Sequence, residues 1–295
     1  IIMINDGSFD NSLDIATNLS KKFSFIKIIS QKNKGLGGAR NTGILNAKGS
    51  YLLFLDADDH IIYNSLKKVL NLALEKELDI LEFGAQGVNT NEDVIYQVKF
   101  KNSNEHVITG VEYYNTEKTI NSACNKLYRR NFLKQKKLLF TEKIYGEDFE
   151  FNTRALFFAE RVMSCPFITS RFLQSANSIT RSQNSESKKK YINDLITILL
   201  KIKSFKNNFE VSKKNELFFN KRMTVINIDI FFMLFKNNFS FTEILEIRKK
   251  LKLQSVYYIS HHIQNLKKDF FRIVFLNNNF IFFRLVSYLK LLLKQ

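Results

Sequence analysis

Residues 51–59 read YLLFLDADD, an apolar run that ends in three carboxylates within four positions. Such a run is typical of a strand buried on both faces, so we expect it to deliver these acids to the edge of a sheet. In an extended chain, positions i and i+2 share a face, which places Asp56 beside Asp58. Adjacent carboxylates repel unless a cation lies between them, and Mg²⁺ or Mn²⁺ suits oxygen ligands. The alternative is a polar strand end before a helix capped by Asp59 or Asn64.

The composition is that of a globular protein with a strong positive charge. The 295 residues are 45% hydrophobic and 25% charged, with a net charge of +17 and a pI near 9.7. This charge indicates an anionic partner, although a general lysine bias in the composition also produces it. Cys124 and Cys165 have no C-x-x-C spacing, and the four histidines are scattered. We therefore expect a reducing cytoplasm, without a disulfide framework or a zinc site.

Strands and helices alternate in the first part of the chain. This alternation predicts a doubly wound α/β sheet, in which ligands gather at the carboxyl ends of the strands. Asp6, Asp56 and Asp58 are therefore expected around one crevice. The predicted order is a strand at 1–5, a turn at Asp6-Gly7-Ser8, a helix at 11–23, a strand at 25–29, a glycine loop at 31–43, a short helix, and the strand at 51–59.

The glycine loop reads GLGGAR at residues 35–40. Its glycines permit close backbone approach just before a helical turn, where amide groups favour anions. It is neither a Walker loop nor G-x-G-x-x-G, because Arg40 stands where the last glycine would be. From this loop alone, a tight structural turn is the favoured interpretation.

Three segments in register carry a family resemblance: INDGSFDNS (4–12), NKGLGGARNTGI (33–44) and AKGSYLLFLDADD (47–59). Together they resemble the signature of family-two inverting glycosyltransferases with the GT-A nucleotide-sugar fold. The resemblance implies an α/β class, with a GT-A-type doubly wound, mostly parallel sheet that has helices on both faces. Three later segments also resemble that family: SACNKLYRRNFL (122–133), YGEDFEF (145–151) and SANSITRS (175–182).

One part of the family pattern is missing before residue 1. Enzymes of this kind begin with another strand and helix, whose turn contacts the nucleotide. In the doubly wound order that strand is central, so we expect unpaired strand edges and an incomplete uridine pocket. The chain is then either a fragment of a longer enzyme or a truncated, inactive glycosyltransferase remnant, and the remnant is an alternative to an active enzyme.

The resemblance also implies the catalytic chemistry. Inverting transfer needs a base for the acceptor hydroxyl and positive charge for the leaving diphosphate. Asp148 matches the general base, with Glu147 beside it, although both acids also suit a helix N-terminus, where the helix dipole would lower their pKa. Asp58 matches the ligand of a Mn²⁺ or Mg²⁺ cofactor, and Asp56 assists the metal or touches the ribose.

The implied donor site takes in the first strand end and the glycine loop. Asp6 resembles the residue that accepts a hydrogen bond from the pyrimidine base, and Lys34 and Arg40 would help to neutralise the diphosphate. Arg129 and Arg130 would attract anions or lie on an exposed face. The donor-binding residues are Asp6, Gly7, Ser8, Lys34, Gly37, Arg40 and Asp56.

The composition changes near residue 187, which divides a catalytic domain (1–186) from a helical, basic and aromatic region (187–295). Its aromatic residues either pack a core, lie with the cations on an anionic membrane surface, or line a nucleic-acid groove. The last ranks lowest because no nucleic-acid module motif appears, so we expect no nucleic-acid partner.

We conclude that the sequence indicates a glycosyltransferase that moves a sugar from a nucleotide-sugar, a UDP-sugar in the first instance, to a hydroxyl of a surface glycan or lipid-linked acceptor. We expect it in the cytoplasm or peripherally on the inner face of the plasma membrane. A membrane-surface binding module driven by the basic tail is a further alternative.

Overall fold

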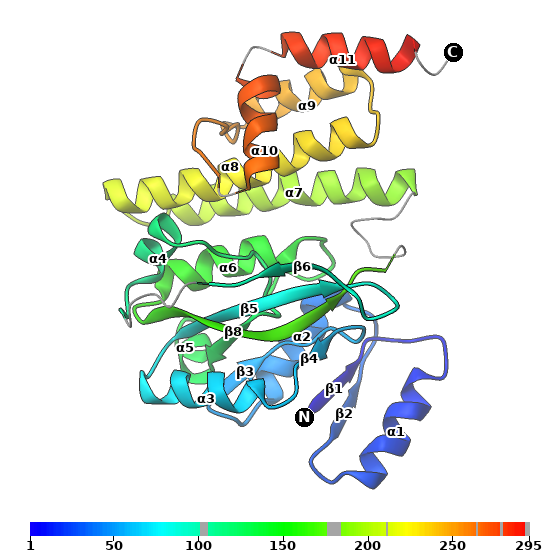
Figure 1. Cartoon of the computed structure of the whole chain (residues 1–295), viewed down its shortest axis with the longest axis vertical. Coiled ribbons are helices and arrows are strands. Elements are labelled where there is room, and N and C mark those ends of the chain that lie inside the picture. The colour runs from blue at the N-terminus through cyan, green and yellow to red at the C-terminus, as the bar shows by residue number, and fades with distance from the viewer. Residues whose placement is uncertain (101–105, 176–183, 211, 264, 278–279, 293–295) are drawn as a thin grey trace. The chain divides into compact units, whose positions relative to one another are not determined.

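The computed structural model of the chain describes residues 1–100, 106–175, 184–210, 212–263, 265–277 and 280–292. Residues 176–182 of the SANSITRS motif therefore lie outside the described residues. The chain divides into two compact units, Ile1–Asn184 and Ser185–Gln295, and each is considered by itself (Figure 1).

The first unit alternates strands and helices as predicted, but the glycine loop expected at 31–43 is wrong in part, because the helix already begins at Gly35. Its elements are β1 (Ile2–Asn5), α1 (Ser12–Lys22), β2 (Lys27–Ser30), α2 (Gly35–Asn46), β3 (Tyr51–Leu53), β4 (His60–Ile61), α3 (Ser65–Glu75), β5 (Ile80–Val88), β6 (Val94–Val98), α4 (Gly110–Thr116), β7 (Lys126–Arg129), α5 (Arg130–Gln135), α6 (Glu147–Phe158) and β8 (Val162–Leu173).

The described strands of this unit form two sheets. Strands β1 and β2 pair in parallel with each other, and the larger sheet has the order β3-β7-β5-β8-β4 with β6 on β5. Strands β1 and β3 are end strands, and each has one edge without a partner among the described strands. The α/β class is confirmed. The larger sheet is mixed rather than mostly parallel, because β3 pairs antiparallel with β7, and of the pairings in that sheet only β5 with β8 is parallel.

Strand β3 is shorter and less buried than its apolar sequence predicts. Leu52 and Phe54 are buried, whereas Leu55 is 50% exposed. The expectation of burial on both faces is wrong because β3 is an end strand of the sheet rather than a central one. Residues 57 and 58 form a turn, so the argument that Asp56 and Asp58 share the face of a strand does not apply.

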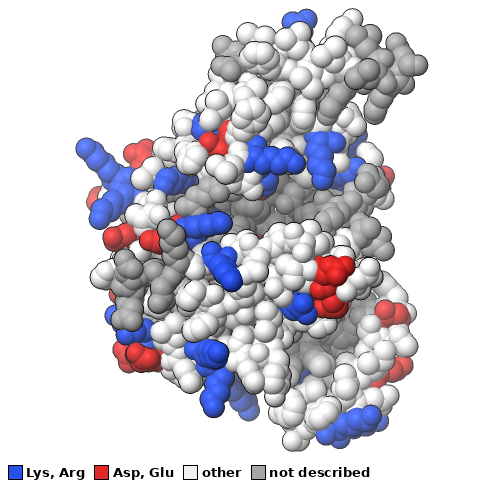
Figure 2. Space-filling model, viewed as in Figure 1, with Lys and Arg blue, Asp and Glu red and all other residues white. Residues whose placement is uncertain are grey.

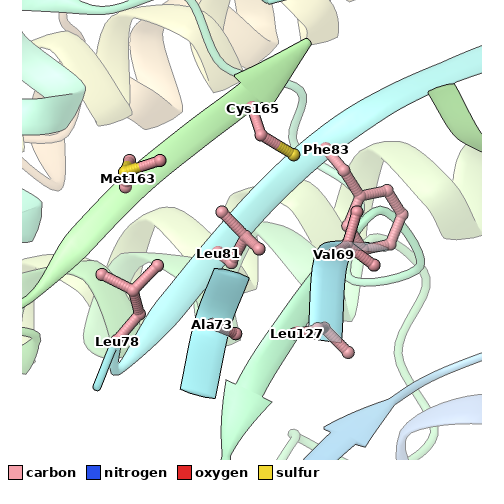
Figure 3. Close-up of a cluster of buried hydrophobic side chains, with 8 residues drawn as sticks. All are labelled: Val69, Ala73, Leu78, Leu81, Phe83, Leu127, Met163 and Cys165. Atoms are coloured by element: carbon pink, nitrogen blue, oxygen red, sulfur yellow. The ribbon is translucent and has the colours of Figure 1, made fainter. Parts of the chain in front are cut away.

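The core of the first unit lies between α3 and the larger sheet. Helix α3 contributes apolar side chains on one side, and β5, β7 and β8 contribute the facing ones, which Figure 3 shows pointing toward one another. Asn64 holds the N-cap position of α3 but makes no capping hydrogen bond with its side chain, and Asp59 is not a cap. The cluster is Val69, Ala73, Leu78, Leu81, Phe83, Leu127, Met163 and Cys165.

The second unit is helical. Its elements are α7 (Ser185–Lys206), α8 (Lys213–Lys236), α9 (Phe241–Leu253), α10 (Leu266–Phe271), the π-helical turn η1 (Arg272–Leu276) and α11 (Ile281–Leu292).

Aromatic side chains pack much of the interior of this second unit. Phe231, Phe271 and Phe280 are buried, and Phe231 meets Phe280 edge to face with centroids 5.4 Å apart. The core interpretation of the tail aromatics is therefore confirmed for these residues. Helix α9 begins with a capping box of Ser240 and Glu243, which satisfies amide groups at its first turn. Among the described helices, none combines the length and the apolar character that a membrane crossing requires.

Candidate active site

Arg40 lies at the centre of a buried cluster of charges in the first unit. Its side chain projects from α2, and its two terminal nitrogens donate to carboxylates from two other segments. Nη2 lies 2.8 Å from Asp56 Oδ1, and Nη1 lies 2.6 Å from Glu147 Oε1 and 2.7 Å from Asp148 Oδ1. Burial by itself would lower the pKa of Arg40, but the surrounding acids, Asp148 foremost, raise it well above its ordinary value. One cation therefore joins the turn after β3 to the start of α6.

Aromatic rings pack against the guanidinium of this cluster. The Arg40 guanidinium carbon lies 5.3 Å from the ring centroid of Phe140 and 5.9 Å from that of Phe54. These two rings meet edge to face, and Phe140 stacks on Phe151 with centroids 3.8 Å apart. Because the surroundings are apolar, the ion pairs are stronger than in water, and an unpaired charge there is costly.

The glycines of α2 let this helix approach the segment before α6. A Cβ at Gly37 would lie 2.4 Å from the Thr141 carbonyl oxygen, and a Cβ at Gly38 would lie 2.3 Å from the Lys34 Cβ. The helix begins at Gly35, which adopts a φ of +74°. This packing brings Arg40 to α6 and gives Gly37 a structural reason to lack a side chain; its predicted contact with the donor stays a prediction.

The two acids at the start of α6 differ in their surroundings. Asp148 accepts from Arg40 with one oxygen and from the Ala123 N–H with the other, at 3.1 Å, and its side chain is 19% exposed. Glu147 is 5% exposed. Burial first, and the charge of Asp148 second, raise the pKa of Glu147 to about 7, although Arg40 opposes the shift. Desolvation thus outweighs the helix dipole, which alone would lower this pKa.

Asp59, the third acid of the DADD segment, connects this segment to β8 by a hydrogen bond. Asp59 Oδ1 accepts a hydrogen bond from the Leu173 N–H at 2.9 Å. Burial raises the pKa of Asp59 to about 6, and the charges of Asp56 and Asp58 add to the shift. Sequence reasoning missed this contact, and the sole signal for it was the third carboxylate of the motif.

Asp58 is exposed on the turn after β3 and forms no ion pair within the described part of the chain. No group of three or more His, Cys, Asp or Glu residues among the described positions is arranged to hold a metal ion. An exposed carboxylate near Asp56 nevertheless suits a Mg²⁺ or Mn²⁺ ion whose remaining ligands are phosphate oxygens and water, because such ions take one or two protein carboxylates. The residues present therefore fit this cofactor as a shared site with a diphosphate.

The predicted donor-binding residues at the first strand end organise the loop before α2. Asp6 Oδ1 accepts from Gln31 Nε2 at 2.6 Å and from the Lys34 N–H at 2.9 Å. Gly7 has a φ of +80°, and the Ser8 N–H donates to the Asn5 side chain at 3.1 Å. Lys34 precedes α2, and the helical rise places it about 9 Å along the axis from Arg40.

Two arginines from the NKLYRR segment make contacts within the first unit. Arg129 pairs with Asp79, and Arg130 Nε donates to the Gly49 carbonyl at 2.9 Å. Lys126, in the same segment, is buried with Nζ 3.1 Å from Glu82 Oε1. Periodicity and motif gave no signal for this last pair, because Glu82 lies inside an apolar strand.

Part of the chain is similar to known glycosyltransferases. Residues 1–135 match the family described as glycosyl transferase family 2. The chain is 32% identical over 185 residues to the uncharacterized glycosyltransferase EpsJ of Bacillus subtilis, covering 61% of this chain and 54% of EpsJ. It is 30% identical over 165 residues to the poly(ribitol-phosphate) beta-glucosyltransferase of Bacillus spizizenii, covering 55% of this chain and 25% of that protein.

A solved structure has a fold similar to that of this chain. S. aureus TarS residues 1–349, crystallised in complex with UDP-GlcNAc, aligns over 86% of this chain and 68% of that one, with a TM-score of 0.57 and 21% identity. At that identity the likeness shows the GT-A fold. The chain spans about half the length of EpsJ.

Proposed function

We propose that this chain is an inverting, metal-dependent glycosyltransferase that transfers a sugar from a UDP-sugar to a hydroxyl of a bacterial surface glycan or a lipid-linked acceptor. The observation that carries the proposal is the Arg40 cluster. It places Asp56, Glu147 and Asp148 around one guanidinium. The match of residues 1–135 to glycosyl transferase family 2, the glucosyltransferase relative and the UDP-GlcNAc complex of TarS support the reaction class and the donor.

In this proposal Asp148 is the general base. Its carboxylate is partly exposed, whereas Glu147 is nearly enclosed. Arg40 and the Ala123 N–H hold the two Asp148 oxygens, which orients the group toward an incoming hydroxyl. The hydroxyl oxygen forms a bond to the anomeric carbon as the bond to the diphosphate breaks, and Asp148 takes the hydroxyl proton. The single displacement inverts the anomeric centre, and no covalent intermediate is required.

The donor side is held by Asp58, Asp56 and the loop around Asp6. A bound Mg²⁺ or Mn²⁺ ion would supply positive charge to the leaving diphosphate. Asp58 would hold that ion, and Asp56 would assist. Asp6, which already orders the loop before α2, would accept from the base of the nucleotide.

UDP release from a panel of UDP-sugars, with Mg²⁺ or Mn²⁺ present, tests the proposal in the full-length protein. We expect turnover with one donor and a loss of about 10²- to 10⁴-fold in Asp148→Asn, the range for a positioned base. Asp148→Asn should still bind the donor in calorimetry, which separates a lost base from a lost fold. Asp14→Asn, on the exposed side of α1, is the matched control.

Two results would refute this proposal. A folded protein that neither binds nor cleaves any UDP-sugar in the presence of metal would fit the inactive-remnant alternative instead. Unchanged turnover in Asp148→Asn would show that Asp148 is not the general base. Glu147→Gln would then be compared in the same assay.

A further inference from the structure

Helix α11 carries an apolar stripe that the second unit leaves uncovered. Ile281, Leu285, Tyr288 and Leu289 are each more than half exposed, at 61%, 53%, 63% and 53%. With 3.6 residues per turn these positions fall on one side of the helix, and we call them the α11 stripe. Single exposed leucines are ordinary, but an apolar row along a helix marks an interaction surface.

A second row of the same kind lies on α10 and η1. Leu266, Phe270 and Ile273 are 83%, 65% and 49% exposed, at spacings of four and three residues. Asp269 and Phe271, on the other side of the same segment, are buried. Both helices are packed on another side, because α10 has buried residues and α11 contacts α9 and η1. The exposed apolar rows on α10 and α11 are therefore not the result of an incompletely packed core.

The positive charge of the chain is concentrated in the same unit. Residues 185–295 contain 21 Lys and Arg against eight Asp and Glu, which is 13 of the 17 net positive charges. Residues 1–184 contain 24 cations against 20 acids. A lysine bias of the whole composition would affect both parts equally, so the asymmetry is a property of the second unit. Figure 2 shows mostly uncharged surface with scattered Lys and Arg at the end formed by α9 and α11.

The positive charge of the second unit and the aliphatic side chains of the α11 stripe together favour one class of partner. A second copy of the chain would bring together two units that each carry 13 net positive charges, which is unfavourable. Nucleic acid would use the cations and aromatic rings, but it has no use for a row of aliphatic side chains. An anionic bilayer uses both, because aliphatic side chains enter the acyl boundary while cations stay at the headgroups. Arg284, which is exposed on α11, provides such a cation.

We propose that α11 lies in the interfacial plane of an anionic lipid bilayer, with the α11 stripe toward the acyl chains. This binding surface is separate from the Arg40 cluster and does not depend on the proposed transferase activity.

Co-sedimentation of the full-length protein with lipid vesicles tests the proposal. We expect binding to phosphatidylcholine vesicles that contain phosphatidylglycerol, and binding weaker by about tenfold or more without the anionic lipid or at high salt. Leu285→Asp with Leu289→Asp should lower the partition at least about tenfold, because two apolar side chains lose their burial in lipid. Arg284→Glu should weaken binding to anionic vesicles specifically.

The matched control is Leu45→Asp with Leu74→Asp, which changes two exposed leucines on helices of the first unit. It should bind vesicles as the wild type does. Circular dichroism and thermal unfolding should show that all variants are folded, since every changed side chain is exposed. The proposal is overturned if the wild type ignores anionic vesicles or binds neutral ones equally. It is also overturned if the α11 variant binds like the control, or if the stripe mediates self-association or RNA binding instead.

Discussion

Arg40 Nη1 lies 2.7 Å from Asp148 Oδ1, and the other terminal nitrogen of the same guanidinium lies 2.8 Å from Asp56 Oδ1. Through one buried cation, the proposed base is connected to the acid expected beside the diphosphate. This contact makes Arg40 a positioning residue: it holds both acids, and its charge reduces their mutual repulsion. The sequence prediction that Arg40 neutralises the donor diphosphate stays a prediction, because in this structure the guanidinium is engaged by carboxylates.

Replacing Arg40 should destabilise the first unit strongly. Arg40→Met leaves three carboxylates without their cation, of which Glu147 is buried, and loss of one partner from a buried ion pair costs about 3–5 kcal/mol. We expect a loss of this size in the free energy of unfolding, measured by urea denaturation. Arg171→Met is the control, because Arg171 pairs with the exposed Glu92 and should change stability by less than about 1 kcal/mol. Equal stability of the two variants would contradict the central role of Arg40.

The free energy of unfolding should fall as the pH rises through neutrality. Glu147 has a pKa of about 7 in the folded chain against 4.5 for an ordinary glutamate, so between these values the folded state binds more protons than the unfolded state. Stability from this group is therefore full below pH 4.5 and is lost as the pH rises through 7, by an amount of about 3 kcal/mol at most.

Urea unfolding of the wild type and Glu147→Gln across this pH range measures the effect. The glutamine is neutral at every pH, so the variant should lose this part of the pH dependence. Glu92→Gln, in an exposed pair, should keep the wild-type slope. The interpretation is wrong if Glu147→Gln and the wild type show parallel curves.

Asp58→Asn should separate metal binding from stability. Asp58 is exposed and forms no ion pair in the described part of the chain, so its replacement should leave the unfolding free energy within about 0.5 kcal/mol. If Asp58 holds the divalent ion, the affinity for a UDP-sugar in the presence of Mn²⁺ should fall about tenfold or more, while the weaker affinity in the presence of a chelator is unchanged. Calorimetric titration with and without Mn²⁺ checks both values. If Mn²⁺ raises the UDP-sugar affinity of Asp58→Asn as much as that of the wild type, residues other than Asp58 hold the metal.

The buried pair of Lys126 and Glu82 should act as a support for the loop that contains Ala123. Lys126 Nζ also donates to the carbonyls of Ile120 and Ser122, at 2.6 and 2.8 Å. Lys126→Met leaves the buried Glu82 carboxylate without a cation, although the Tyr113 and Thr119 hydroxyls still donate to it, and should cost about 3–5 kcal/mol of unfolding free energy. Adding Glu82→Gln removes that charge and should restore at least about 1 kcal/mol. If the double variant is less stable than the single one, the unpaired charge is not the cause.

The local elements of the first unit followed closely from the sequence. The helix expected at 11–23 is α1, Ser12–Lys22, and the strand expected at 1–5 is β1, Ile2–Asn5. Helical spacing and turn residues act over a few positions, so they are visible in a single sequence. For the run at 51–59, the prediction of a strand buried on both faces was wrong. An apolar strand at the end of a sheet and one at its centre have similar sequences, so the sequence does not distinguish them.

The sequence by itself therefore determined the family signature, the alternation of strands and helices, and the acids expected to do the chemistry. Only the tertiary structure decided how those acids are paired. Arg40 and Glu147 are 107 positions apart, and their contact depends on α2 packing against the segment before α6. The raised pKa of Glu147 likewise comes from burial by distant segments, which no local pattern encodes. Likewise, which aromatic residues of the second unit pack its core and which face outward was decided by helix packing, because both sets have the same helical spacing.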